Sequence, residues 1–206
     1  MTVPEPTTQS PGGSRRPGRP RSQSAQRAIL DAALDLLAAD GFERMSIEAV
    51  AARAGVGKTT IYRWWTSKDD LVIDAMENLI ADVQPPDTGS VRGDLVELIL
   101  QIERVLTSTR AGEVFPRMVA EVAAASPLGV AYLERVINPR FAIVESILAR
   151  GVRRGDLRAG LDLELARDLL LGPIVFAKLT RRLPSRRAPR RAERLVDLLL
   201  GGLAAT

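Results

Sequence analysis

The stretch GVGKTT, residues 55–60, is where residue types and spacing could do chemistry. Gly57, Lys58 and Thr59 match the end of a phosphate-binding loop, in which backbone N–H groups cradle phosphates and the lysine reaches the terminal ones. That interpretation predicts a nucleotide-hydrolysing enzyme. The same residues also suit the turn and the first residues of a DNA-reading helix. The flanking residues therefore have to decide between the two.

The flanks do not fit a phosphate-binding loop. Such a loop follows a buried strand and carries a glycine five residues before its Gly-Lys pair. Here that position is Ala52, and the upstream SIEAVAARA has a helical period that includes Glu48 and Arg53. We therefore favour a helix–turn–helix, with one helix at 46–54 and a second beginning at Lys58. Periodicity alone leaves open a plain helical hairpin with a solvated basic face.

The composition narrows the class of protein. Of 206 residues, 46% are hydrophobic but only 4% aromatic, a mixture that favours packed helices over sheets. The absence of Cys and His excludes ordinary zinc sites, Cys nucleophiles and His general bases. We predict no catalytic residue, no metal and no other cofactor, so the protein is not expected to be an enzyme. A chain without cysteine fits the cytoplasm, and no apolar run approaches the ~18 residues of a membrane span.

Hydrophobic periodicity predicts an all-α fold in two helical parts. Residues 1–22 are rich in Pro, Gly, Ser, Thr and Arg and are expected to form a disordered basic arm. A three-helix domain with the helix–turn–helix follows at 23–70, and a larger helical domain at 71–206. Ser46 and Ser67 are expected N-caps. The helices are expected from about 24 to 40 and over 46–54, 58–64, 68–84, 90–110, 113–125, 127–150, 162–182 and 188–203.

Residues 19–75 resemble the N-terminal DNA-binding domain of the tetracycline-repressor (TetR/AcrR) family. The matching elements, in order, are ILDAALDLLAADGFE, SIEAVAARAGV and IYRWW followed by SKDDL. The third helix departs from the family, because it has Lys58-Thr59-Thr60 where many members have small residues. The pair Trp64-Trp65 also stands where an aromatic-His-Phe pattern is common.

The resemblance implies that the third helix lies in the major groove. Lys58 and Arg63 are the best candidates to donate to guanine O6 and N7. Thr59 suits a thymine methyl or a phosphate, and Tyr62 and Lys68 match phosphate-contacting positions of the family. The other candidates are Ser46 at a phosphate, Thr60 as a local backbone partner, Trp64 on sugar-phosphate or in the core, and Arg19 and Arg21 in a minor-groove hook or a nonspecific basic tail.

The resemblance further implies a ligand chamber in the larger domain and a homodimer formed by its last two long helices. The sequence supports the dimer separately, because Leu195 to Leu200 leave little room for a polar face. The expected interface residues are Leu165, Leu169, Leu195, Val196 and Leu199. The chamber candidates, each of which could instead be ordinary core, are Phe115, Met118, Glu121, Tyr132, Phe141 and Phe176.

The sequence as a whole predicts a ligand-responsive transcriptional regulator, in particular a repressor. It would bind a pseudo-palindromic double-stranded DNA operator as a homodimer and respond to a small, largely apolar effector. The alternatives are a helical small-molecule-binding protein with vestigial DNA binding and, less well supported, a phosphate-loop NTPase.

Overall fold

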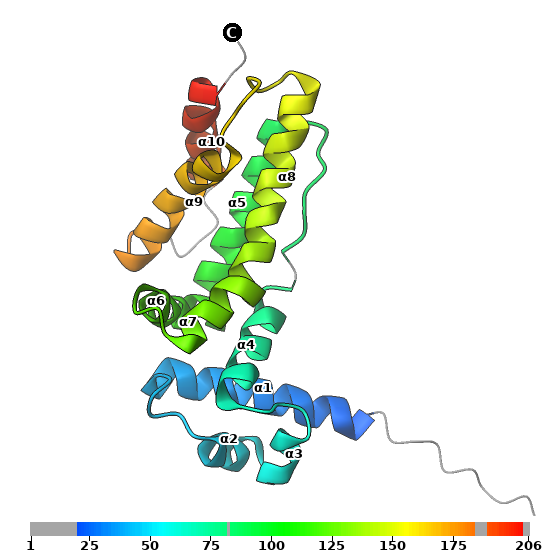
Figure 1. Cartoon of the computed structure of the whole chain (residues 1–206), viewed down its shortest axis with the longest axis vertical. Helices are drawn as coiled ribbons and strands as arrows, with labels where there is room; N and C mark the ends of the chain where they lie inside the picture. The colour runs from blue at the N-terminus through cyan, green and yellow to red at the C-terminus, as the bar shows by residue number, and fades with distance from the viewer. Residues whose placement is uncertain (1–19, 82, 184–188, 204–206) are drawn as a thin grey trace, which may run out of the picture.

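The computed structural model describes residues 20–81, 83–183 and 189–203, without the side chains of 20–22 and 203 (Figure 1). Regular structure in these ranges is helical, as predicted, and includes no strand. The elements are α1 (Pro20–Asp40), α2 (Ile47–Ala54), α3 (Lys58–Tyr62), α4 (Lys68–Leu79), α5 (Val91–Ser108), α6 (Arg110–Ala123), α7 (Pro127–Tyr132), the π-helical η1 (Leu133–Ile137), α8 (Asn138–Arg154), α9 (Leu163–Leu179) and α10 (Pro189–Leu203).

Helices α1, α2 and α3 form one end of the molecule, and α4 leads from them into the larger domain (Figure 1). Fully buried side chains from these helices, including Ile29, Val50, Ile61 and Leu71, make the core of this end. Helix α1 begins at Pro20, earlier than expected; proline suits a first helical position because its N–H is not needed there. Residues 1–19, most of the expected basic arm, lie outside the described residues.

The predicted N-caps are confirmed. Ser46 Oγ accepts a hydrogen bond from the Ala49 N–H at 3.1 Å, and Ser67 Oγ accepts one from the Asp70 N–H at 3.0 Å. Each serine satisfies a backbone donor that the first turn leaves unpaired. Gly55 ends α2 at φ +67°, a left-handed conformation that glycine adopts without steric cost.

The larger domain is built around the long helices α5 and α8, which lie side by side (Figure 1). Helices α6 and α7 lie at the end nearest α1, and α9 and α10 lie along one edge. Two ion pairs join these helices at buried carboxylates: Arg150 on α8 with Asp94 on α5, and Arg191 on α10 with Glu103 on α5.

Several helix boundaries differ from the prediction. Helix α4, expected to extend to residue 84, ends at Leu79. The segment expected as one helix over 127–150 consists of α7, η1 and α8; Pro139 follows the π-helical turn and, lacking an N–H, cannot continue a regular ladder. Gly151 does not end α8, which continues to Arg154. It allows close packing instead, because a Cβ there would lie 2.5 Å from Val91 Cγ2.

No single helix in the described ranges is long and apolar enough to cross a membrane. The bent pair Arg110–Ala123 and Pro127–Arg154 passes the same test by length and composition, but its two parts meet at 115°.

Candidate DNA interface and ligand cavity

The turn at Gly55–Gly57 orients α3 so that its two faces differ. Ile61 is fully buried and Trp65, just beyond the helix, is 3% exposed. Lys58, Thr59 and Tyr62 lie on the exposed side. A strand-based phosphate loop is excluded, because the segment before the turn is the helix α2. The result is a short helix anchored by apolar residues on one side, with cationic and hydroxyl side chains exposed on the other.

Lys58 is paired with an acid of the preceding helix. Its Nζ donates to Glu48 Oε1 at 2.9 Å, and both side chains remain more than half exposed. The hydrogen bond lowers the pKa of Glu48 and raises the pKa of Lys58. A DNA base or phosphate would therefore compete with Glu48 for this ammonium group.

We predict that Glu48→Gln raises affinity for all DNA sequences about two- to fivefold, because Lys58 loses its competing carboxylate and one negative charge leaves the DNA-facing surface. Fluorescence anisotropy with specific and random duplexes at several salt concentrations measures this change. Glu164→Gln, an exposed acid at the start of α9, is the matched control. An equal gain in the control would show that only net charge matters.

Lys68 connects the start of α4 to the loop between α1 and α2. Its Nζ donates to the Phe42 carbonyl at 2.9 Å and the Met45 carbonyl at 3.1 Å, and lies 4.0 Å from the centre of the Phe42 ring. The side chain thus ties the α1–α2 loop to the start of α4. An ammonium group has three N–H donors, so one remains for the phosphate contact expected from the sequence.

The aromatic pair after α3 joins core and surface. The Trp64 and Trp65 rings meet edge to face with centroids 5.5 Å apart, and Trp65 Nε1 donates to Asp74 Oδ2 at 2.8 Å. Trp64 is half-buried, and the exposed Arg63 guanidinium lies 5.3 Å from its ring centre. Thr60 is half-buried, and Arg19 and the side chain of Arg21 lie outside the described residues.

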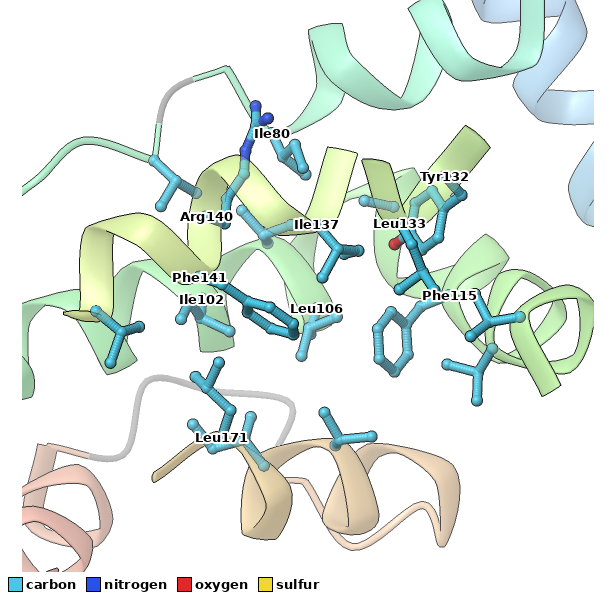
Figure 2. A pocket seen from close by; sticks show the side chains of 18 of the residues that line it. Ile80, Ile102, Leu106, Phe115, Tyr132, Leu133, Ile137, Arg140, Phe141 and Leu171 are labelled. Carbon is cyan, nitrogen blue, oxygen red and sulfur yellow. The ribbon is translucent and has the colours of Figure 1, made fainter. Parts of the chain in front are cut away.

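A cavity of about 380 Å³ lies in the larger domain between α4, α5, α6, η1, α8 and α9 (Figure 2). Its volume falls within the range of small-molecule sites, roughly 300–1,000 Å³. The wall is almost entirely apolar. The lining residues are Met76, Ile80, Val83, Ile102, Val105, Leu106, Ala111, Phe115, Val119, Val122, Tyr132, Leu133, Ile137, Arg140, Phe141, Val144, Asp168, Leu171, Gly172, Ile174 and Val175.

Three of the expected chamber residues line this cavity, namely Phe115, Tyr132 and Phe141. The other three lie elsewhere. Met118 is fully buried in the core, Glu121 accepts a hydrogen bond from Ser126 Oγ at 2.6 Å, and Phe176 is 58% exposed on the outer face of α9.

Arg140 and most of the aliphatic wall were not predicted. Arg140 carries a sequence signal, because Leu133, Ile137 and Val144 share its helical stripe at spacings of three and four residues. An arginine that interrupts an apolar stripe is predicted to place its charge against the buried side of the helix. The aliphatic residues carry no such signal, because core and cavity wall have the same composition.

The residues expected at the dimer interface differ in how exposed they are in the single chain. Leu165 and Leu169 on α9 are 56% and 53% exposed, whereas Leu195 and Leu199 on α10 are half-buried. Val196 does not fit the expected interface, because it is fully buried against its own chain and cannot face a partner. Leu198, at 77% exposure, is the outward residue of α10, so this helix is less enclosed than its leucines suggested.

Ion pairs and hydrogen bonds join helices of the cavity wall to α1 and α4. On α6, Arg110 pairs with Asp31 of α1 at 3.0 Å, and Arg117 Nη2 donates to the Ala38 carbonyl at 2.8 Å. On η1, Arg135 pairs with Asp70 at 2.9 Å and Glu77 at 3.1 Å, both on α4. A shift of α6 or η1 would therefore act directly on α1 and α4 through these contacts.

This arrangement defines a helix–turn–helix DNA-binding protein with a cavity-containing helical domain. The chain belongs to the tetracycline-repressor family. The model of bacterial regulatory proteins of the tetR family matches residues 29–75, and the tetracyclin repressor-like C-terminal domain matches residues 85–199. Proteins of this family are DNA-binding transcriptional regulators, and this chain is such a regulator.

Relatives and solved structures agree with this assignment. The chain is 38% identical to the uncharacterised HTH-type transcriptional regulator YdeS of Bacillus subtilis, over 77% of this chain and 80% of that protein. It is 30% identical to a DNA-binding transcriptional repressor TetR of Mycobacteroides abscessus, over 79% and 84% of the two chains. The TetR family regulator SCO0332 superposes with a TM-score of 0.64 at 29% identity, covering 88% of this chain and 99% of that one.

A further solved structure shares the fold. The transcriptional regulator FadR of Bacillus subtilis, solved in complex with stearoyl-CoA, superposes with a TM-score of 0.69 at 21% identity, over 86% of this chain and 98% of that one.

Proposed function

We propose that this protein is a homodimeric repressor that binds a pseudo-palindromic operator and releases it when a small molecule fills the cavity. The observation that carries the proposal is the two-faced α3, with Ile61 and Trp65 buried and Lys58, Thr59 and Tyr62 exposed. One α3 from each protomer would enter the major groove, with half-sites about 10–10.5 bp apart or a multiple of that. Its place of action is the cytoplasm, where the operator DNA lies.

An exposed apolar stripe on α9 supports a dimer. Leu165, Leu169, Gly172, Phe176 and Leu179 follow one another at alternating spacings of four and three residues, the repeat of a helix that packs along a partner helix. The four large residues of this α9 stripe are each more than 40% exposed. Gly172 leaves open space at the centre of the stripe, which lets a second helix approach closely. A two-fold axis would pair the stripe with its own copy.

The cavity supports control by a ligand, for which the relevant quantity is the difference in affinity between the DNA-competent and DNA-incompetent states. Phe115 on α6 and Leu133 and Ile137 on η1 line the cavity. The same two elements carry Arg110, Arg117 and Arg135, which bond α1 and α4. A ligand that shifts α6 or η1 would thus change the distance between the two α3 helices of a dimer.

The direct test is selection of bound fragments from the host genome by the purified protein. An enriched palindrome is expected, and Arg63→Ala or Lys58→Ala should relax its sequence, at a cost of about 1–3 kcal/mol per lost base contact. Tyr62→Phe should weaken binding to all sequences alike, because a phosphate contact carries no sequence information. A folded dimer that binds small molecules and enriches no sequence at low salt would instead be a carrier with vestigial DNA binding.

A further inference from the structure

Among the residues that the structure describes, the cavity is apolar except at three side chains. Of its lining residues only Tyr132, Arg140 and Asp168 carry polar groups. A buried polar group normally has a partner, because leaving it unpaired is destabilising. The partners of these three side chains therefore indicate whether the cavity is complete in itself or is shaped for a ligand.

Tyr132 has a donor without an acceptor. The residue is 4% exposed, and among the described residues its hydroxyl has no hydrogen-bond partner. Figure 2 shows the hydroxyl on the cavity side of the ring, near Leu133. Burial raises the pKa of this phenol, so it stays protonated at physiological pH and presents an O–H to the cavity.

Arg140 has a charge without a counter-charge in the described part of the chain. Its Nη1 donates to the Val136 carbonyl at 3.2 Å, and within the described ranges no carboxylate forms an ion pair with it. Figure 2 shows its side chain reaching from α8 towards Ile80, at the end of α4. A guanidinium has five N–H donors, so most of its hydrogen-bonding capacity is unused.

Other charged side chains near the cavity do have partners of opposite charge, unlike Arg140. Arg135, five residues earlier, pairs with both Asp70 and Glu77. Asp168, the acidic residue of the cavity wall, is held by Arg167 at 2.9 Å, and Arg167 also pairs with Glu145. The described acid of the wall is thus neutralised away from Arg140, and the unpaired charge among the described cavity residues is positive.

We propose that the cavity binds a single-chain amphiphile with an anionic head, carboxylate or phosphate. Arg140 pairs with the head, the Tyr132 hydroxyl donates to an oxygen of the ligand, and the chain lies among Phe115, Phe141 and Leu171. This assignment rests on the proposed function for its effect on DNA, but the preference for an anionic head can be tested by binding alone.

The test is isothermal titration calorimetry of the full chain with dodecanoate, dodecyl phosphate and dodecanol, each below its critical micelle concentration. The three share one chain and differ in the head. The wild-type protein is expected to bind at least one of the anions about tenfold or more tightly than the alcohol, because a charge-assisted hydrogen bond in an apolar site is the stronger kind. The tighter of the two anions identifies the head group.

Two Arg140 variants test the anion preference, and a Tyr132 variant tests the hydrogen bond to the ligand oxygen. Arg140→Gln is expected to lower anion affinity about tenfold and to leave dodecanol binding unchanged, while Arg140→Lys keeps most of the preference. Tyr132→Phe is expected to weaken all three ligands a few-fold, because each offers an oxygen acceptor. Arg153→Gln removes an exposed charge from the same helix and is the matched control. Thermal unfolding of each variant without ligand confirms that it is folded.

Equal binding of the three ligands, no binding of any, or an anion preference that survives in Arg140→Gln would overturn the assignment. If the cavity binds the anions but the protein is not a ligand-controlled repressor, the experiment gives a different result. In that case the anions bind through Arg140 but leave operator affinity unchanged. If dodecanol releases the operator as well as the anions do, the regulator proposal stands and the ligand class is wrong.

Discussion

Leu169→Glu is expected to convert the protein from a dimer to a monomer and to weaken operator binding by about 10²–10⁴-fold. Leu169 lies near the middle of the α9 stripe and is 53% exposed in the single chain. In a two-fold dimer this position meets its own copy or a neighbour of it, so one substitution places two carboxylates in an apolar interface. Burying unpaired charges there costs more than an exposed leucine stabilises.

The loss of DNA affinity follows from how a dimer binds. Once the first recognition helix is seated, the second half-site contact is intramolecular, and its effective concentration supplies most of the affinity for a palindrome. A monomer keeps the contacts of one α3 and loses that gain. Size-exclusion chromatography with light scattering measures the oligomeric state, and anisotropy with full and half operators measures both affinities.

Val130→Glu is the control for this experiment. Val130 is 46% exposed on α7 and lies outside the α9 stripe, so the same change of an apolar residue to an acid should leave the dimer intact. The half-operator affinity of Leu169→Glu should stay within about threefold of the wild-type value, because α3 is unchanged. A dimer that survives Leu169→Glu would place the interface on another surface.

The sequence predicted the local features of the fold well. A cap such as Ser46 or Ser67 needs only the residue and its three successors, and the apolar period of α1 or α2 is read within a dozen positions. The boundary of α4 and the π-helical turn at Leu133–Ile137 were missed. The end of α4 has no glycine or proline in its own sequence to mark it, whereas Pro139 is a local signal for the π-helical turn that the apolar period of 127–150 outweighed.

The candidate site was predictable in part for the same reason. The exposed side of α3 follows from its period, since Ile61 and Trp65 fix the buried side. The partner of Lys68 could not be inferred, because the Phe42 and Met45 carbonyls lie 26 and 23 residues away in the chain. The sequence predicted that the larger domain holds a cavity but not most of the residues that line it. An apolar residue in a cavity wall and one in a packed core have the same sequence signal.

The pair Asp94–Arg150 is a long-range contact of this kind, and Asp94→Ala is expected to cost about 3–5 kcal/mol of unfolding free energy. Asp94 is fully buried; it accepts hydrogen bonds from the Thr88 N–H at 2.6 Å and from Arg150 Nη2 at 2.7 Å. Arg150 also donates to the Pro86 carbonyl, and its Nε is buried without a partner in the described part of the chain. Without Asp94 this partly buried guanidinium would lose the carboxylate that neutralises it.

The expected loss corresponds to a fall in melting temperature of roughly 6–20 °C for a chain of this size. Thermal unfolding followed by circular dichroism measures it. Asp87→Ala, an exposed acid in the same α4–α5 connection, is the matched control and should change little. Equal effects of the two substitutions would mean that Asp94 contributes no more than a surface carboxylate.

The same residue gives the stability a pH dependence of known sign. Burial alone would raise the pKa of Asp94, but hydrogen bonds from Thr88 and Arg150 outweigh it and hold the pKa below its ordinary value. A carboxyl with a lowered folded pKa stabilises the protein above its unfolded pKa, and this stabilisation is lost as the pH falls through the folded value. Urea unfolding between about pH 7 and about pH 3 should show a smaller loss of stability on acidification for Asp94→Asn than for the wild type, because the variant lacks the titrating group. A wild-type loss that Asp94→Asn reproduces in full would assign the acid sensitivity to other carboxylates.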